Sequence, residues 1–305
     1  MRTLISILFA AMLPMLAAAQ IAEEKINSII KGKHAKVGVA WIVDDKEHTV
    51  NNADCYPLMS VFKLHGAIAV LRQMERRGTP TDTMVRVSAS QVTKNTYTPM
   101  LERYPESGFT IRFDSLLHYS VAESDNNACD IIISMAGGIE GVNAELRAIG
   151  LADYNLKETE ISMQADPMRS YDNCSTPLSV AILFRKLFEE NILGEPYATL
   201  LKHILISTTT GPDKIKAALE PGMLLAHKTG TGFTKDDGTM IADNDAGAVM
   251  LPDGRKLYIA VLIKDTKLGS KENARLIAEI ARVILSTHPS PSRREGVSNM
   301  PCQQQ

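Results

Sequence analysis

The sequence predicts an α/β fold of the α+β type, an antiparallel sheet flanked by helices, with an all-helical lobe inserted in the middle of the chain. Alternating apolar and polar residues predict two strands in residues 36–53 and three more in residues 223–266. Between them, residues 57–204 show mainly the spacing of amphipathic helices. The order of strands, a long helical insertion, and then strands with a helix predicts one sheet built from both ends of the chain.

Turn and helix-end signals define the elements of the first half. Strands in residues 36–45 and 46–53 meet at a polar Asp-Asp-Lys turn. A mainly helical stretch begins near Pro57, and its first helix stops at Gly78, because glycine readily takes the left-handed conformation that ends a helix. Further helical runs follow in residues 113–123, 126–136 and 141–150.

The second half begins with a long polar stretch, residues 153–177, which has two prolines and little periodicity. A segment of this length without secondary structure is usually functional in a compact domain. The remaining elements are a helix, three strands and a closing amphipathic helix, in residues 178–192, 223–232, 244–253, 255–266 and 271–288. A Pro-Asp-Gly sequence at 252–254 predicts the turn of the last hairpin.

The composition is that of an ordinary globular protein, with 45% apolar and 22% charged residues among 305. A chain of this size can bury a large core. We expect a discontinuous sheet domain, residues 20–56 and 205–288, and a helical domain, residues 57–204, that includes the stretch 153–177. The formal net charge is −2, so the sequence has no electrostatic sign of a nucleic-acid partner.

The two ends of the chain have distinct compositions. Residues 1–19 join a positive Arg2 to an apolar run and three alanines, which is typical of a secretory signal peptide cleaved before Gln20. The run is too short for a membrane span, so we expect a periplasmic or secreted protein without a stable membrane anchor. Residues 289–305 have the composition of a disordered tail.

Cysteines and histidines give no sign of a metal site. The histidines form no HxH or HExxH motif, and the four cysteines form no CxxC pair. The cysteines are Cys55, Cys129, Cys174 and Cys302. Export makes disulfides possible, but the spacing leaves their pairing open. We expect neither a metal nor an organic cofactor.

Three short motifs contain the residue types of nucleophilic catalysis. They are SVFK at 60–63, near a helix start, SDN at 124–126, between two helices, and KTG at 228–230, on a predicted strand. Each could be structural when taken alone, because a lysine can extend to solvent from an apolar helix and Asp or Asn often caps a helix.

The first motif is suited to covalent catalysis. Residues three apart share a helix face, so Ser60 and Lys63 are expected to be neighbours. A serine hydroxyl is a weak nucleophile at neutral pH and needs an adjacent base, which Lys63 can supply.

In this order and in these contexts, the motifs resemble those of the serine β-lactamase and penicillin-binding protein superfamily, and of class A β-lactamases in particular. The resemblance covers nearly all of the chain after the signal peptide. It implies a β-lactamase/transpeptidase-like fold, an acyl-enzyme on Ser60, a β-lactam as small-molecule partner, and a monomer. In the family, Ser124 would pass a proton to the leaving nitrogen and Lys228 would stabilise its hydroxyl, while Asn126 would bind Lys63 and a substrate amide.

The resemblance implies roles for the strand residues as well. The backbone N–H groups of Ser60 and Thr231 would form the oxyanion hole that stabilises the tetrahedral intermediate. Thr229 and Gly230 belong to the same substrate-binding strand, and Tyr97 fits the aromatic wall of the pocket.

Hydrolysis of the acyl-enzyme needs a carboxylate, which the family supplies from a loop between the second and third motifs. Glu160 fits the family's Glu-x-x-Leu/Met pattern, and Glu158 is the second candidate. Gln164 stands where an asparagine is usual and can bind the hydrolytic water. Whether Lys63 or the loop glutamate is the acylation base stays open. The family's loop clamp is replaced by Glu158 and Asn173, so the loop should be held differently.

Other departures resemble the extended-spectrum, cephalosporinase-leaning branch of class A. Lys214 would replace the arginine that binds the substrate carboxylate, and Met59, not a cysteine, precedes the nucleophile. Two alternatives stay open. One is a low-molecular-mass penicillin-binding protein, a D-alanyl-D-alanine carboxypeptidase, and the other is a β-lactam sensor that acylates once without hydrolysis. The loop glutamate argues against the first.

Overall fold

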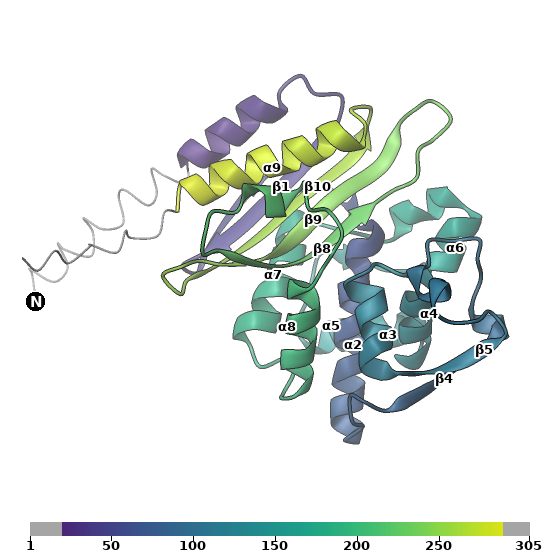
Figure 1. Ribbon diagram of the computed structural model, residues 1–305. Helices are drawn as coiled ribbons and strands as arrows, with labels where there is room; N and C mark the ends of the chain where they lie inside the picture. The colour runs from purple at the N-terminus through teal and green to yellow at the C-terminus, as the bar shows by residue number, and fades with distance from the viewer. Residues whose placement is uncertain (1–19, 289–305) are drawn as a thin grey trace, which may run out of the picture.

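The structure is a computed structural model that describes residues 20–288. Its main feature is a five-stranded antiparallel sheet with the order β2-β1-β10-β9-β8 (Figure 1). The strands are β1 (Lys36–Val43), β2 (Lys46–Val50), β8 (Leu224–Thr231), β9 (Met240–Met250) and β10 (Lys256–Thr266). The sheet therefore joins both ends of the chain, which confirms the predicted arrangement and both hairpin turns.

Side chains of the central strands alternate between two cores. On β1, Val39 and Trp41 join a core on one face, and Ala40 and Ile42 join a larger core on the other. The outer face is covered by a helix over residues 20–30 and by α9 (Ser270–Ser286), which lie side by side in Figure 1. The sheet is thus buried on both faces, which explains the long apolar runs of its central strands.

The inner face of the sheet packs against the helices of the inserted region. They are α2 (Lys63–Arg77), α3 (Phe113–Val121), α4 (Asn126–Met135), α5 (Gly138–Ala148), α6 (Glu160–Ala165), α7 (Pro177–Glu189) and α8 (Tyr197–Ile206). Short 3-10 turns occur at η1 (Met59–Phe62), η2 (Ala89–Gln91), η3 (Pro99–Glu102), η4 (Pro167–Asp172) and η5 (Ile215–Ala218).

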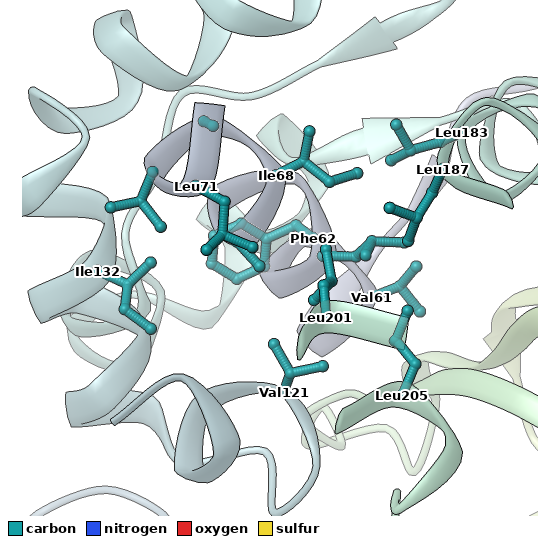
Figure 2. Close-up of a cluster of buried hydrophobic side chains, with 14 of the residues drawn as sticks. Val61, Phe62, Ile68, Leu71, Val121, Ile132, Leu183, Leu187, Leu201 and Leu205 are labelled. Atoms are coloured by element: carbon teal, nitrogen blue, oxygen red, sulfur yellow. The ribbon is translucent and has the colours of Figure 1, made fainter. Parts of the chain in front are cut away.

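Helix α2 lies at the centre of the larger core. Its residues from Lys63 to Leu71 are buried all round, and Figure 2 shows Ile68 and Leu71 among side chains from the neighbouring helices. Gly78 ends the helix in the left-handed conformation, at φ 62°, as the sequence predicts. The nucleophile motif therefore begins on the most deeply packed helix of the fold.

The inserted region is mainly helical, but "all-helical" is too strict. It also contains the two-stranded sheet β4 (Met84–Ser88) with β5 (Gly108–Arg112). A three-stranded sheet joins β3 (Tyr56–Pro57), β7 (Cys174–Ser175) and β6 (Tyr154–Asn155). β3, β6 and β7 have two residues each, too few for an alternating pattern to be visible in the sequence, whereas β4 and β5 have five each and were missed.

The remaining predictions had different outcomes. The stretch 153–177 is not without structure, because it contains α6 and η4. The helix over residues 20–30 was not predicted. The predicted signal peptide, 1–19, and tail, 289–305, lie outside the described residues, and the division into two domains stays a prediction. Within residues 20–288, no helix is long and apolar enough to span a membrane.

Candidate active site

The predicted site residues gather around one cavity of about 510 Å³ between the sheet and the helical region. Nine of them line it directly: Ser60, Tyr97, Ser124, Asn126, Glu160, Gln164, Lys214, Thr229 and Thr231. The side chains of Lys63 and Lys228 are buried, and Gly230 is close to the turn that holds Ser60. Residues up to 171 positions apart in sequence thus share one site, from Ser60 to Thr231.

Ser60 lies in the turn η1, directly before α2, and this turn is held from several sides. Met59 has a positive φ of 46°, a conformation that is uncommon for a side chain of this size. The side chain of Asn244 on β9 donates to the carbonyl oxygens of Pro57 and Leu58 at 2.8 and 3.0 Å. The Leu58 N–H donates to the Asn173 carbonyl at 2.8 Å. The position of Ser60 is therefore set by β9 and by the end of the loop.

Strand β8 passes very close to this turn at Gly230. A Cβ atom on Gly230 would lie 2.5 Å from the Leu58 carbonyl oxygen and 3.0 Å from the Ser60 nitrogen. Only glycine allows this approach, since both neighbours are backbone atoms that cannot move aside. The next residue, Thr231, is consequently brought beside Ser60.

Lys63 connects the parts of the site. Its side chain is buried, and its ammonium donates to Asn126 Oδ1 at 2.6 Å and to the Ser124 carbonyl at 2.5 Å. Glu160 Oε1 lies 3.1 Å from Lys63 Nζ, which is close enough for an ion pair although the two groups are not aligned as a hydrogen bond. A buried lysine that contacts both a carboxylate and polar groups is well placed for proton transfer.

Ser124 is placed by strained backbone and by a second buried lysine. Its φ is 63°, in the left-handed region. Lys228 Nζ donates to Ser124 Oγ at 2.9 Å, the contact expected from the sequence. Burial, followed by the nearby charge of Lys63, lowers the pKa of Lys228 well below its usual value. The Lys228 ammonium therefore gives up a proton more easily than an exposed lysine.

The middle residue of the second motif has a structural function. The Asp125 carboxylate accepts hydrogen bonds from the N–H groups of Ala128 and Met100, both at 2.8 Å, and from the Thr98 hydroxyl at 2.9 Å. It thereby caps α4 and ties η3 to it. Capping by Asp125 and the placement of Ser124 and Asn126 in the pocket are compatible, because the three side chains point to different partners.

The loop that carries Glu160 is closed by hydrogen bonds between the Asn173 side chain and the backbone of residues 157–158. Asn173 Oδ1 accepts from the N–H groups of Lys157 and Glu158 at 2.8 and 2.9 Å, and its Nδ2 donates to the Glu158 carbonyl at 2.8 Å. The Glu158 carboxylate pairs with Arg169, on the same loop, at 3.3 Å. Glu158 therefore contacts the loop itself and lies outside the cavity lining, whereas Glu160 lies within it.

Asp130, on α4, binds the backbone of the loop at Glu160. Its two carboxylate oxygens accept the N–H groups of Glu160 and Ile161 at 2.8 and 2.9 Å. Burial raises the pKa of Asp130 to about 6, although the two N–H groups lower it in part. Asp130 thus positions the backbone of the expected catalytic base.

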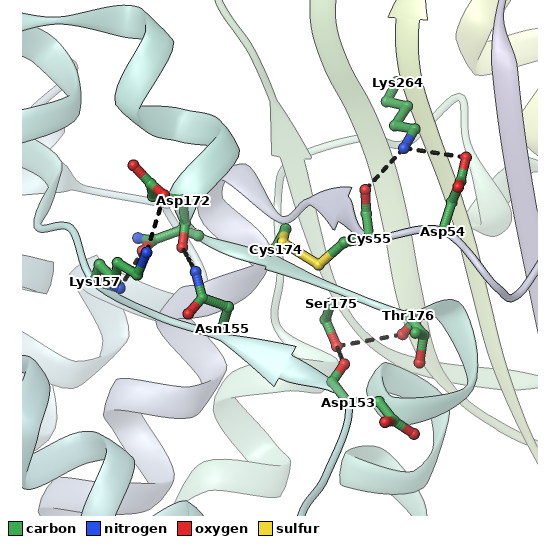
Figure 3. Close-up of a disulfide and its surroundings, with 11 residues drawn as sticks. Asp54, Cys55, Asp153, Asn155, Lys157, Asp172, Cys174, Ser175, Thr176 and Lys264 are labelled. Atoms are coloured by element: carbon green, nitrogen blue, oxygen red, sulfur yellow. Dashed lines mark hydrogen bonds and ion pairs between the residues drawn. A yellow bond between two sulfur atoms is a disulfide. The ribbon is translucent and has the colours of Figure 1, made fainter.

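A disulfide joins the end of this loop to the segment before β3. Cys55, before β3, is bonded to Cys174 on β7, with a Cα–Cα distance of 5.4 Å (Figure 3). Ser175, the next residue, donates to the Asp153 carbonyl at 3.0 Å. The disulfide therefore links the segment that leads to Ser60 with the end of the loop. Cys129 is a buried free thiol, and Cys302 lies outside the described residues.

Lys214 lies in the pocket wall, where it forms an ion pair with Asp243 that the sequence did not predict. Its ammonium is 2.5 Å from Asp243 Oδ1, and both side chains are almost completely buried.

Tyr97, in contrast, is 59% exposed at the pocket mouth. Gln164 borders this cavity and a second one of about 230 Å³, which shares Asn126 and Glu160 with it.

Sequence reasoning missed three supporting residues: Asp130, Asp243 and Asn244. The last two begin a run of polar residues, Asp-Asn-Asp, inside the otherwise apolar strand β9. Buried polar side chains are costly unless they have partners, so such a run in a strand between two others was a usable signal. In the part of the chain that is described, no three His, Cys, Asp or Glu side chains gather as a metal site.

Comparison with known proteins agrees with this arrangement. The model of the beta-lactamase enzyme family matches residues 21–288. The chain is 38% identical to a β-lactamase of Bacteroides uniformis, over 91% of this chain and 95% of that one. It is 36% identical to the extended-spectrum β-lactamase PER-1 of Pseudomonas aeruginosa, over 87% of each. The crystal structure of a class A β-lactamase from Bacteroides cellulosilyticus superposes with a TM-score of 0.86 at 38% identity, over 89% of this chain and 98% of that one.

Proposed function

Because the chain belongs to the class A serine β-lactamases, we propose that it is exported and hydrolyses β-lactam antibiotics through an acyl-enzyme on Ser60. The observation that carries the mechanism is the buried contact between Lys63 and Glu160, 3.1 Å apart at the edge of the cavity that Ser60 lines. It supports the proposal because such a pair would provide a base for each half-reaction in the cavity that Ser60 lines.

In acylation, Ser60 Oγ attacks the lactam carbonyl carbon and its proton passes to the Lys63–Glu160 pair. The negative charge that develops on the carbonyl oxygen is stabilised by the N–H groups of Ser60 and Thr231, a device typically worth about 3–4 kcal/mol. The carbon–nitrogen bond then breaks, and Ser124 gives its proton to the lactam nitrogen. Lys63, whose Nζ lies 3.5 Å from Ser124 Oγ, passes the proton taken from Ser60 on to Ser124, and the 2.9 Å contact with Lys228 stabilises the Ser124 hydroxyl during this transfer.

In deacylation, Glu160 takes a proton from a water molecule that attacks the ester carbonyl carbon, and as the bond to Ser60 Oγ breaks the Lys63–Glu160 pair returns this proton to Ser60 Oγ. Gln164 helps to hold this water through its amide, since both side chains line the same cavity. This step separates a lactamase from the alternatives, a penicillin-binding protein and a sensor, which keep the acyl group. A carboxylate in ion-pair contact with Lys63 favours the lactamase.

Substrate recognition follows from the other lining residues. We assign the substrate's side-chain amide to Asn126, which also accepts a hydrogen bond from Lys63 and donates to Thr96 at 2.7 Å. Tyr97 forms one wall of the mouth, and Thr229 lines the side of β8. We propose penicillins and cephalosporins as substrates, a periplasmic or secreted location and a monomeric enzyme.

The test uses purified protein and a chromogenic cephalosporin, followed by mass spectrometry of the intact chain. The wild type should turn over many times, and Ser60→Ala should lose at least about a thousandfold in kcat/KM. Glu160→Gln should accumulate an adduct with the mass of the whole β-lactam, while Glu158→Gln should continue to turn over. A single burst with a lasting adduct on the wild type would support the peptidase or the sensor, and full turnover by Glu160→Gln would move the base elsewhere.

A further inference from the structure

A buried ion pair lies in the wall of the active-site cavity, on the side of α9. Lys214 Nζ is 2.5 Å from Asp243 Oδ1, and the two side chains are 7% and 1% exposed. Both residues line the cavity, together with Thr231. Removing two charges from water carries a desolvation penalty in free energy, which a wall of neutral side chains would not have.

The hydrogen-bond donors of the Lys214 ammonium group are already engaged by protein groups. This group can donate three hydrogen bonds. Besides Asp243, it contacts the carbonyl oxygen of Asn244 at 3.1 Å and the hydroxyl of Thr231 at 3.4 Å. The Thr231 hydroxyl is also engaged, because it donates to Asp243 Oδ1 at 3.1 Å. Asp243 thus engages both Lys214 and Thr231, whereas Lys271, at the start of α9, is a second cation that lines the cavity.

Asp243 faces the cavity because of the strand register. It is the cross-strand partner of Thr231 on β8. The next two residues on β9 have structural partners: Asn244 holds the segment before Ser60, and Asp245 contacts His227 at 2.9 Å. Only the first of the three polar residues in this run is therefore turned to the substrate side.

We propose that Asp243 is a specificity-determining residue that cancels the charge of Lys214, so that this wall attracts a substrate carboxylate much less than a free lysine would. The inference rests on the proposed function, because it concerns how the same site selects among β-lactams. The wall then discriminates little between a β-lactam that carries a ring carboxylate and its neutral ester, and the remaining attraction comes from Lys228 and from Lys271, which also lines the cavity.

The proposal predicts an order among four forms of the enzyme. The pair carries no net charge in the wild type and in the double variant Lys214→Gln/Asp243→Asn. It is positive in Asp243→Asn and negative in Lys214→Gln. The measured quantity is the ratio of kcat/KM for a cephalosporin acid to kcat/KM for its methyl ester. This ratio should rise about tenfold in Asp243→Asn, fall about tenfold in Lys214→Gln, and return to within about threefold of the wild type in the double variant.

The opposite reading is that Lys214 is the carboxylate ligand and Asp243 only holds it in place. It predicts that Lys214→Gln and the double variant lose the preference for the acid equally, and that Asp243→Asn does not raise it; either result would overturn the proposal. If Asp243→Asn fails to fold because Lys214 is left unpaired, comparison of Lys214→Gln with the double variant still decides. Asp82→Asn changes the net charge equally at an exposed position outside the cavity and should leave the ratio unchanged. Failure of the proposed function would look different, since the wild type would then hydrolyse neither compound.

Discussion

The two halves of the site are held by different kinds of interaction. The half that holds Ser60 and Lys63 belongs to the main core, where α2 is surrounded by apolar side chains and β8 packs against the turn before it. The half that holds Glu160 belongs to the loop 153–177, which is fixed by Asn173, Asp130 and a disulfide. Close packing positions the nucleophile, with additional hydrogen bonds from Asn244 and Asn173 to the preceding turn, whereas polar bonds and a disulfide position the base.

This difference separates the two chemical steps. Damage to the packed half should affect acylation first, because it displaces Ser60 and the oxyanion hole. Damage to the loop should affect deacylation first, because it displaces Glu160 while Ser60 stays in place. The polar half should also respond to pH, since its supports include an ionisable group, Asp130.

The largest effect is expected from Gly230→Ala, in the packed half. The new Cβ would lie 2.5 Å from the Leu58 carbonyl oxygen, so β8 and the turn of Ser60 would have to separate. A shift of about 1 Å at a catalytic group can cost about a hundredfold in rate, and here the nucleophile and the oxyanion hole move together. We expect acylation to slow at least about a hundredfold, measured as the single-turnover rate of adduct formation.

Gly66→Ala, on α2, is the matched control. Its Cβ would meet one atom, the Cγ1 of Ile133, at 3.3 Å, and this side chain can adjust. The acylation rate of Gly66→Ala should stay within about fivefold of the wild type. If Gly230→Ala acylates at the wild-type rate, close approach of β8 is not what positions Ser60.

The sequence predicted the packed half better than the loop, and the reason is physical. Long apolar runs define α2 and the central strands, and the motifs at 60–63, 124–126 and 228–230 come from local residue types. The supports of the loop come from side chains distant in sequence, such as Asp130 for Glu160. The pairing of Cys55 with Cys174 depends on the fold in the same way, so spacing alone left it open.

The second prediction concerns the loop and the substitution Asn173→Ala. The side chain is completely buried and provides three hydrogen bonds to the backbone of residues 157–158. Its removal leaves buried polar groups unpaired, at a cost of about 1–3 kcal/mol for each. We expect deacylation to slow about tenfold to a hundredfold while the acylation rate stays within about threefold, so that the acyl-enzyme becomes visible at steady state.

Asp172→Ala is the matched control, because its carboxylate is half-exposed and, among residues 20–288, pairs only with Lys157, at 3.4 Å. Exposed ion pairs contribute about 0–1 kcal/mol, so both rates should remain near those of the wild type. An equal loss of acylation and deacylation in Asn173→Ala would mean that the loop and the nucleophile are not supported separately.

The smallest effect is the pH dependence caused by Asp130. Since burial raises the pKa of its carboxyl from the usual 3.8 to about 6, the native protein takes up a proton there at a higher pH than it would on an exposed aspartate. The protonated acid has one oxygen that is a full acceptor, where the Glu160 and Ile161 N–H groups need two. Deacylation should therefore decrease a few-fold as the pH falls from 7 to 5. Asp130→Asn should lack this part of the profile, although its rate at pH 7 should be lower.

The same titration affects stability with the opposite sign, and this distinguishes it from a general effect of acid. A raised pKa means that Asp130 favours folding below about pH 4, and that this contribution is lost as the pH rises through about 6. Between pH 7 and pH 5, the free energy of unfolding of the wild type should therefore increase relative to that of Asp130→Asn, while its deacylation rate decreases. Denaturant unfolding at both pH values measures the first change and single-turnover kinetics the second. If stability and deacylation decrease together relative to Asp130→Asn, the acid sensitivity comes from another group, and Asp130 does not couple the loop to pH.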